Sequence, residues 1–145
     1  MKDKIKNKKV IFAWLRKAED DLNFARRTFR ETDFFDHVCY LAQQATEKYL
    51  KAIIIIQKGG ITKKEKTHNL IYLSQICRKI ELKDFRKDLR MLTEAYIPAR
   101  YPSNGYTKSS KEDAQKCLKI AEKVIGFIKS KIDFSKFYLN KKDRN

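Results

Sequence analysis

The sequence predicts an all-α fold, an antiparallel up-and-down helical bundle of four long helices plus one short helix. Glycine and proline are sparse, with four Gly and two Pro in 145 residues, which leaves room for long helices and little for hairpin turns. Apolar side chains recur every three to four positions over most of the chain, the period of an amphipathic helix. With 42% apolar and 36% charged residues, the chain can also bury one core, since a protein of this size hides ~70% of its unfolded surface.

The first two predicted helices are long. One spans 11–29, and the next spans 35–57 and is expected to end at Gly59-Gly60, because glycine adopts the left-handed conformation of a helix C-cap without strain. Four isoleucines at 53–56 would also suit a buried strand, but the run before them is strongly helix-forming. The apolar stripe of the first helix consists of Ile11, Trp14, Leu15, Ala18, Leu22, Ala25 and Phe29.

Three more helices complete the predicted bundle. A short helix over 68–79 is capped by Thr67, and a longer one over 84–97 is ended or kinked by Pro98, which lacks a backbone donor. The last long helix extends to residue 132. Two overlapping capping boxes precede it, formed by Ser109 with Glu112 and by Ser110 with Asp113.

The net charge of +16 is unevenly spread. Residues 1–9 and 129–145 each carry an excess of four positive charges, half of the total, and terminal charge is commonly solvated. We therefore predict a basic N-terminal segment at 1–9, a helical bundle at 10–132 and a basic C-terminal tail at 133–145.

Several classes of protein are excluded. The longest apolar run, residues 52–56, is far shorter than the ~18 residues that span a bilayer, and no signal-peptide pattern opens the chain. Cys39, Cys77 and Cys117 are widely separated and form no C-x-x-C pair, so we interpret them as reduced core thiols. The sequence thus predicts a cytoplasmic protein with no membrane association, no metal site and no cofactor.

Two polar constellations are candidates for a site. On the second helix, Gln43, Gln44, Glu47, Lys48 and Lys51 stand at intervals of four, which places them in adjoining rows; a solvated face with ordinary ion pairs is the structural alternative. The second is the segment YIPARYP at 96–102. Its arginine and tyrosines at a proline-bounded helix end suit a phosphate or a stacked base, or simply a rigid interhelical loop. The residues singled out there are Tyr96, Arg100 and Tyr101.

At this point the sequence resembles the HEPN domain family. The motifs WLRKAEDDLNFA (14–25), AQQATEKYLKA (42–52), THNL (67–70) and YIPARYP (96–102) occur in the family's order and spacing. The similarity covers about residues 10–130. It is closest to short prokaryotic HEPN proteins, which are homodimeric helical bundles that partner a minimal nucleotidyltransferase, as a substrate-binding subunit or as one half of a toxin–antitoxin pair.

The resemblance also bears on catalysis. Many HEPN proteins are metal-independent ribonucleases with an Arg-x(4–6)-His motif, in which the arginine stabilises phosphate charge and the histidine moves protons. Arg100 matches by position, but Gly105, Tyr106 and Thr107 occupy the places where the histidine would be. We interpret His68, in THNL, as structural, because a helix N-terminus disfavours a protonated imidazole.

Three functions follow as hypotheses. The first is a non-catalytic HEPN subunit that binds a nucleotide or other substrate and partners a minimal nucleotidyltransferase. Its site residues are Arg100, Tyr101, Tyr96, Gln43, Gln44, Glu47 and Lys48, with Tyr101 and Tyr106 as the tyrosines that such a partner could adenylylate. The alternatives are a HEPN ribonuclease with a degenerate motif, using Arg100, and a general nucleic-acid-binding bundle whose lysine-rich ends supply the affinity.

Overall fold

The structure is all-α over the residues that it describes, which are 2–100, 102 and 105–138 of this computed structural model. This confirms the predicted fold class, and the described residues contain no strand. Four long helices and the short α3 build the bundle, as predicted. They are α1 (Lys2–Glu31), α2 (Phe35–Lys58), α3 (Leu70–Ile76), α4 (Arg86–Arg100) and α5 (Lys111–Lys131).

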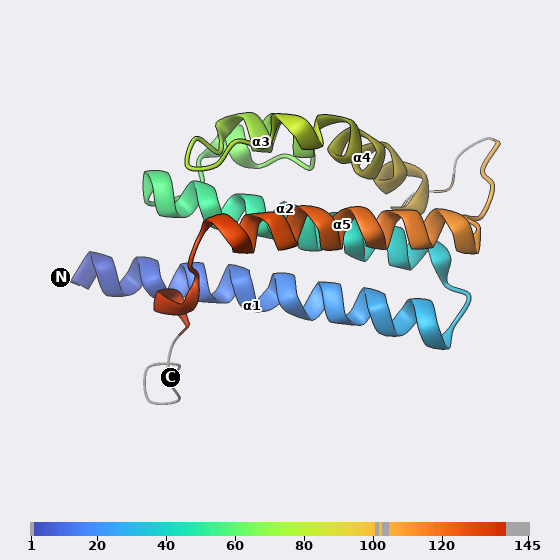
Figure 1. Ribbon diagram of the computed structural model, residues 1–145, viewed down its shortest axis with the longest axis horizontal. Coiled ribbons are helices and arrows are strands. Elements are labelled where there is room, and N and C mark those ends of the chain that lie inside the picture. The colour runs from blue at the N-terminus through green and yellow to red at the C-terminus, as the bar shows by residue number, and fades with distance from the viewer. Residues whose placement is uncertain (1, 101, 103–104, 139–145) are drawn as a thin grey trace.

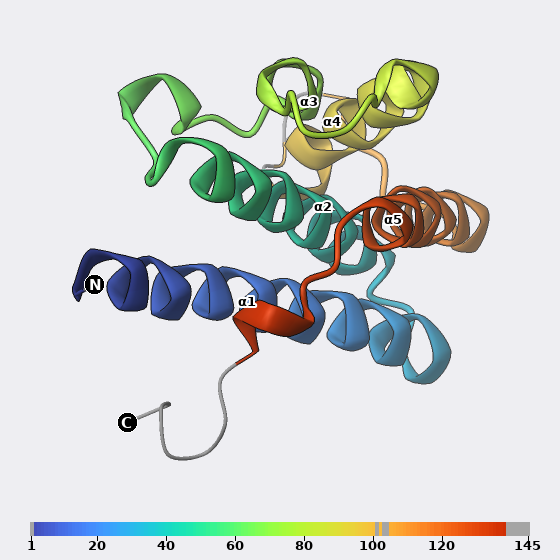
Figure 2. The same ribbon diagram turned by 60° about the vertical axis from the view of Figure 1, so that its left-hand side comes forward.

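Helix α2 is the centre of the bundle (Figures 1 and 2). It packs against α1 on one side and against α3, α4 and α5 on the others, which explains why its C-terminal third is apolar nearly all round. Tyr49, Leu50, Ile53 and Ile54 are fully buried there. The four isoleucines belong to this helix, which ends as predicted at Gly59, at φ 87°, with the Gly59 N–H bonded to the Ile55 carbonyl at 2.8 Å.

Several helix boundaries differ from the prediction, among them the starts of α1 and α3 and the end of α4. α1 begins at Lys2 rather than at residue 11, because lysine is a good helix former even without an apolar stripe. α3 begins at Leu70, since Asn69 Oδ1 accepts the N–H groups of Ile71 and Tyr72 at 3.1 and 3.2 Å and caps the helix in place of Thr67. The third difference is in α4, which continues through Pro98 to Arg100.

The start of α5 selects one of the two predicted capping boxes. Ser110 Oγ accepts the Asp113 N–H at 3.1 Å, and the Asp113 carboxylate accepts the Ser110 N–H at 2.8 Å. The other candidate serine, Ser109, donates its backbone N–H to Asp36 at 2.9 Å instead. That bond ties the α4–α5 connection to the first turn of α2.

The first part of the predicted C-terminal tail packs on the bundle. Phe134 is 6% exposed, and its ring makes an edge contact with the Tyr49 ring, with centroids 5.8 Å apart. A short 3-10 helix, η3 (Ser135–Phe137), follows, and the Tyr138 ring meets Phe12 of α1 at 5.9 Å. Another short 3-10 helix, η2 (Lys83–Phe85), lies in the connection between α3 and α4.

Candidate functional site

A buried polar row crosses the centre of α2. Gln43, Glu47 and Lys51 are 0%, 4% and 7% exposed, which excludes a solvated face for these three residues. Their spacing of four produces the expected contacts, since Glu47 Oε1 accepts from Gln43 Nε2 at 3.3 Å and Glu47 Oε2 accepts from Lys51 Nζ at 3.0 Å. The Lys51 ammonium also lies 5.8 Å from the centre of the Trp14 ring. A buried charge is costly unless it is paired. The contacts within this row supply that pairing, so the row is an integral part of the core.

The row ends at a histidine that reaches the surface. His68, just before α3, places Nδ1 2.7 Å from Glu47 Oε1, and its side chain is 51% exposed. The Gln43 amide also donates to the His68 carbonyl at 3.0 Å, so both the ring and the backbone of His68 are fixed. An ionised carboxylate only accepts, so Nδ1 is the donor in this contact, which leaves Nε2 as the ring nitrogen outside it.

Tyr96 on α4 supports this histidine. The two rings lie 5.0 Å apart at 32°, and Tyr40 stacks with Tyr96 at 5.7 Å and 22°. Tyr96 is only 4% exposed, so its ring holds neighbouring side chains in place rather than offering a face to a base. The Leu70 N–H donates to Thr93 Oγ1 at 3.2 Å, which joins the start of α3 to α4.

Gln44 and Lys48 form the second row of α2. Gln44 Nε2 donates to Gln43 Oε1 at 2.8 Å, while Lys48 Nζ pairs with Asp21 of α1 and lies 3.4 Å from Gln44 Oε1. The predicted site residues on α2 therefore divide into two sets. Gln43 and Glu47 contact His68, whereas Lys48 ties α2 to α1.

Three further predicted residues lie at or after the end of α4. Arg100 is the last residue of α4, one turn after Tyr96. Tyr101 lies outside the described residues. Tyr106 is 41% exposed, and its hydroxyl donates to Asp36.

Asp36 and Tyr106 influence each other's protonation. Partial burial opposes ionisation of Asp36, but the hydrogen bonds from Ser109 and Tyr106 outweigh it and lower the pKa of this carboxyl. The same bond to Asp36 raises the pKa of the Tyr106 phenol. Tyr106 is thus reachable from solvent as a protonated, hydrogen-bonded phenol.

We also searched the part of the chain that the structure describes for a metal site and for a membrane-spanning helix. Within residues 2–100, 102 and 105–138, no three side chains of His, Cys, Asp or Glu are grouped so as to hold a metal ion. Among the same residues, no helix has the length and apolar character needed to cross a membrane. The three cysteines are unpaired by disulfides and buried, as predicted.

His68, predicted to be structural, does bond a side chain, that of Glu47, 21 residues earlier in the chain. The sequence did not identify this partner. The available signal was a histidine in the short motif THNL together with a polar row on another helix. Contact between the two could be inferred only with the fold in hand.

The described residues thus form a helical bundle whose central helix carries a buried ionic row beside an exposed imidazole. The profile of the HEPN domain matches residues 11–131, and the chain belongs to the HEPN domain family, which confirms the resemblance seen in the sequence. A protein of Methanocaldococcus jannaschii named "Putative toxin MJ1304" is 32% identical over 142 residues, covering 89% of this chain and 92% of that protein.

Two solved structures share the fold. TT1696 from Thermus thermophilus aligns with a TM-score of 0.70 at 22% identity, covering 84% of this chain and 98% of its own. ST0689, described as an archaeal HEPN homologue, aligns with a TM-score of 0.64 at 24% identity, covering 83% and 95%. At these identities the likeness concerns the fold alone.

Proposed function

We propose that this chain is a non-catalytic HEPN subunit that binds a nucleotide or nucleotide-bearing substrate and partners a minimal nucleotidyltransferase in a toxin–antitoxin-type pair. The relative from Methanocaldococcus jannaschii, named as a toxin, supports the pairing. The observation that carries the binding role is the buried row of α2 ending at an exposed His68. In this proposal the protein is cytoplasmic and homodimeric.

In this proposal the ligand is bound by His68, whose ring and backbone are held in place before the ligand arrives, and by Arg100. His68 Nε2 accepts a hydrogen bond from a ribose hydroxyl, and the Glu47 carboxylate keeps the imidazole in the required tautomer. Arg100, at the end of α4, supplies positive charge for a phosphate. Gln43 and Tyr96 stabilise the position of His68 and do not themselves contact the ligand.

The homodimer in this proposal has apolar surface to use. Phe24 on α1 and Ile97 on α4 are 60% and 62% exposed, and exposed large apolar side chains are typical of interaction surfaces when they gather. Ile97 lies one turn before the end of α4, so an interface there would lie beside Arg100. Light scattering of the purified protein, compared with the variant Ile97→Ser, tests this point.

Direct binding and co-purification test the proposal. We expect the chain to co-purify with the nucleotidyltransferase encoded by a neighbouring reading frame, and to bind ATP with an affinity that falls about tenfold in Arg100→Gln and in His68→Ala, the loss of one good polar contact. The matched control Arg30→Gln removes an exposed arginine of α1 and should bind as the wild type does. Equal binding by all variants would refute the site.

Adenylylation is tested on the same pair of proteins. We expect incubation with the partner and ATP to add one adenylate to the peptide that contains Tyr101 and Tyr106. Variants Tyr101→Phe and Tyr106→Phe then separate the two hydroxyls by mass spectrometry. An unmodified peptide after incubation would exclude this modification.

A ribonuclease is the second candidate function, and the Glu47–His68 contact favours it. An imidazole oriented by a carboxylate is a suitable general base, so His68 would replace in space the histidine that is absent after Arg100. It would take the proton of a ribose 2′-hydroxyl as that oxygen attacks phosphorus, the bond to the 5′-oxygen would break, and the leaving oxygen would take a proton from water. Cleavage of RNA that is lost in both His68→Ala and Arg100→Gln would establish this function and overturn the non-catalytic one.

A further inference from the structure

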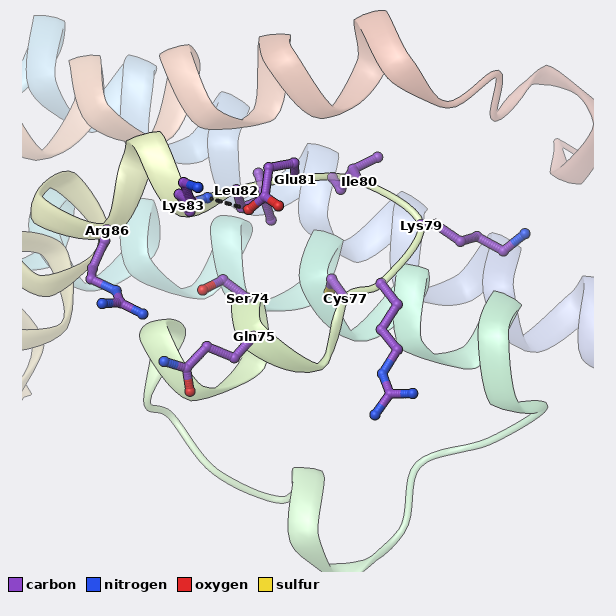
Figure 3. Close-up of a pocket in the computed structure, with 10 residues that line it drawn as sticks. Ser74, Gln75, Cys77, Lys79, Ile80, Glu81, Leu82, Lys83 and Arg86 are labelled. Carbon is purple, nitrogen blue, oxygen red and sulfur yellow. Dashed lines mark hydrogen bonds between the residues drawn. The ribbon is translucent and has the colours of Figure 1, made fainter.

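We propose that the turn between α3 and α4 forms a second binding site, specific for a ligand that carries several phosphate groups. A cavity of about 540 Å³ lies there, between the end of α3 and the start of α4. Figure 3 shows side chains that line it, contributed by α3, by the connecting loop and by the first residue of α4. Four of the lining side chains are cations: Arg78, Lys79, Lys83 and Arg86.

These four cations have no acidic partner among the residues that the structure describes. Glu81, which also lines the cavity, offsets one of these charges, and its carboxylate accepts the Lys83 backbone N–H at 3.1 Å (Figure 3). Some other bases of the chain are paired, among them Lys51 in the core and Lys123, which bonds to Asp88. With four cations and one acid, the lining of the cavity carries a net positive charge.

The turn that carries these cations is held on α2. Gln57 Nε2 donates to the Ile76 carbonyl at 3.0 Å, and Gln57 Oε1 accepts the Lys79 N–H at 2.9 Å. Below the charged rim, Cys77 and Leu82 are each 3% exposed, and Cys77 Sγ donates to the Leu50 carbonyl at 3.5 Å. A fixed backbone reduces the ordering cost of binding, so the site is largely formed in advance.

The charge and size together select the ligand. The lining carries four cations and one acid, and this net positive charge attracts a multiply charged anion more strongly than a singly charged one. Arginines bind phosphate through two parallel hydrogen bonds. A cavity of about 540 Å³ is in the ~300–1,000 Å³ range of small-molecule sites, so a compact triphosphate or nucleoside triphosphate fits it better than a nucleic-acid duplex.

This site is separate from Arg100, the residue proposed above to bind a phosphate. Helix α4 has Arg86 at its first position and Arg100 at its last, over 15 residues, and at a rise of ~1.5 Å per residue its two ends are ~21 Å apart. One triphosphate chain cannot bridge that distance. The two sites therefore make separate predictions, and the failure of one leaves the other standing.

Calorimetric titration of the full chain with inorganic triphosphate tests the proposal. At about 0.15 M ionic strength, we expect the double variant Arg78→Gln/Arg86→Gln to lose at least tenfold in affinity. The matched control Arg30→Gln/Arg90→Gln removes the same charge from exposed arginines outside the cavity and should lose less than twofold. Variants that abolish the His68 site, His68→Ala and Arg100→Gln, should bind triphosphate as the wild type does.

Three results would overturn the proposal. The first is no heat of binding with the wild type at millimolar triphosphate, and the second is an equal loss in the cavity and control variants, which would mean attraction by net charge alone. The third is a loss of triphosphate binding in the His68 variants. Titration with ATP and with a short single-stranded oligoribonucleotide identifies the source of the phosphates, since each is expected to bind through the same arginines if it is the natural source. Gln57→Ala, which keeps every cation, should also weaken binding by loosening the turn.

Discussion

The two ends of α4 handle charge in opposite ways. At the C-terminal end, near Tyr96, the ionic groups of α2 are buried and each has a partner, with Glu47 bonded to Lys51 and His68. At the N-terminal end, from Arg78 to Arg86, cations stand exposed and unpaired among the described residues. A charge count treats both ends alike, yet the buried row of α2 contributes to holding the fold, whereas the exposed cations of the turn remain available to attract an anion.

The difference shows why a net charge of +16 says little about function by itself. A paired, buried charge is part of the packing, and removing its partner leaves an unsatisfied ion in the core. An unpaired, exposed charge costs little in stability and remains free to bind. The following variants separate the two roles, from the largest expected effect to the smallest.

Removing the central carboxylate should have the largest effect. Glu47→Ala leaves the Lys51 ammonium buried without its partner and His68 without its orienting bond, and we expect a loss of about 3–5 kcal/mol in the free energy of unfolding, measured by urea titration. Glu94→Ala, an exposed glutamate on α4, is the control and should change stability by less than about 0.5 kcal/mol. A loss for Glu47→Ala as small as that of the control would refute a structural role for the row.

Acid should weaken the ion pair between Lys58 and Glu65, which lies close to the unpaired cations. Lys58 lines a cavity together with Arg78, but it is bonded to the buried Glu65, and the hydrogen bonds from Lys58 and Thr62 lower the pKa of Glu65 from 4.5 to about 2. Since the folded pKa lies below the unfolded one, this contribution to stability is complete above pH 4.5 and is lost as the pH falls toward 2.

Urea unfolding as a function of pH measures this effect. We expect Glu65→Gln to flatten the stability curve in that acidic window, and Lys58→Met, which removes the first of the two donors, to flatten it in part. An unchanged slope in both variants would mean that other carboxylates cause the acid sensitivity.

Loss of the Gln57 clamp should be moderate. Gln57→Ala removes both hydrogen bonds that hold the turn on α2, and we expect a loss of about 1–2 kcal/mol in thermal or urea unfolding. Gln57→Glu keeps the acceptor for the Lys79 N–H but loses the donor to Ile76, so its loss should be intermediate. Hydrogen exchange at the Lys79 amide should speed up in both variants, and equal exchange rates would contradict the clamp.

Removing cavity cations should have the smallest effect on stability. Arg78→Gln/Arg86→Gln relieves repulsion, and we expect a gain below about 0.5 kcal/mol at low salt. The gain should disappear between about 0.01 M and about 1 M ionic strength, as the Debye length falls from ~30 to ~3 Å. A loss of stability at both salt concentrations would show that these arginines have partners in solution.

The sequence predicted the helices well where an apolar period marks them and less well elsewhere. Residues 11–29 show the stripe, but the lysine-rich stretch before them does not, although α1 includes it. At α3, a chain with both Thr67 and Asn69 offers two caps, and the choice depends on which backbone N–H groups the fold presents. Such choices are local competitions of about 1 kcal/mol, which periodicity cannot decide.

For the candidate site, the sequence predicted contacts along a single helix but not contacts between separate segments. Spacing of four along α2 correctly predicted the contacts of Gln43 with Glu47 and of Glu47 with Lys51. It did not predict their burial, because lysine and glutamate are rarely buried unless paired, and the pairing with His68 crosses between separate segments. Long-range contacts of this kind follow from how helices pack, which a helical period leaves open.

Buried thiols lie near both ends of α4, where their reactivity can report local opening of the structure. Cys77 lies at the floor of the cationic cavity, and Cys39 and Cys117 line a second cavity, of about 350 Å³, beside Pro98. Burial raises the pKa of Cys77 to about 12, and a hydrogen bond with Cys39 together with burial raises the pKa of Cys117. Because the thiolate is the reactive form, each thiol reacts with a labelling reagent only when its end of the helix opens. The relative labelling rates of these native cysteines would therefore report, without any engineered probe, which end of α4 opens first.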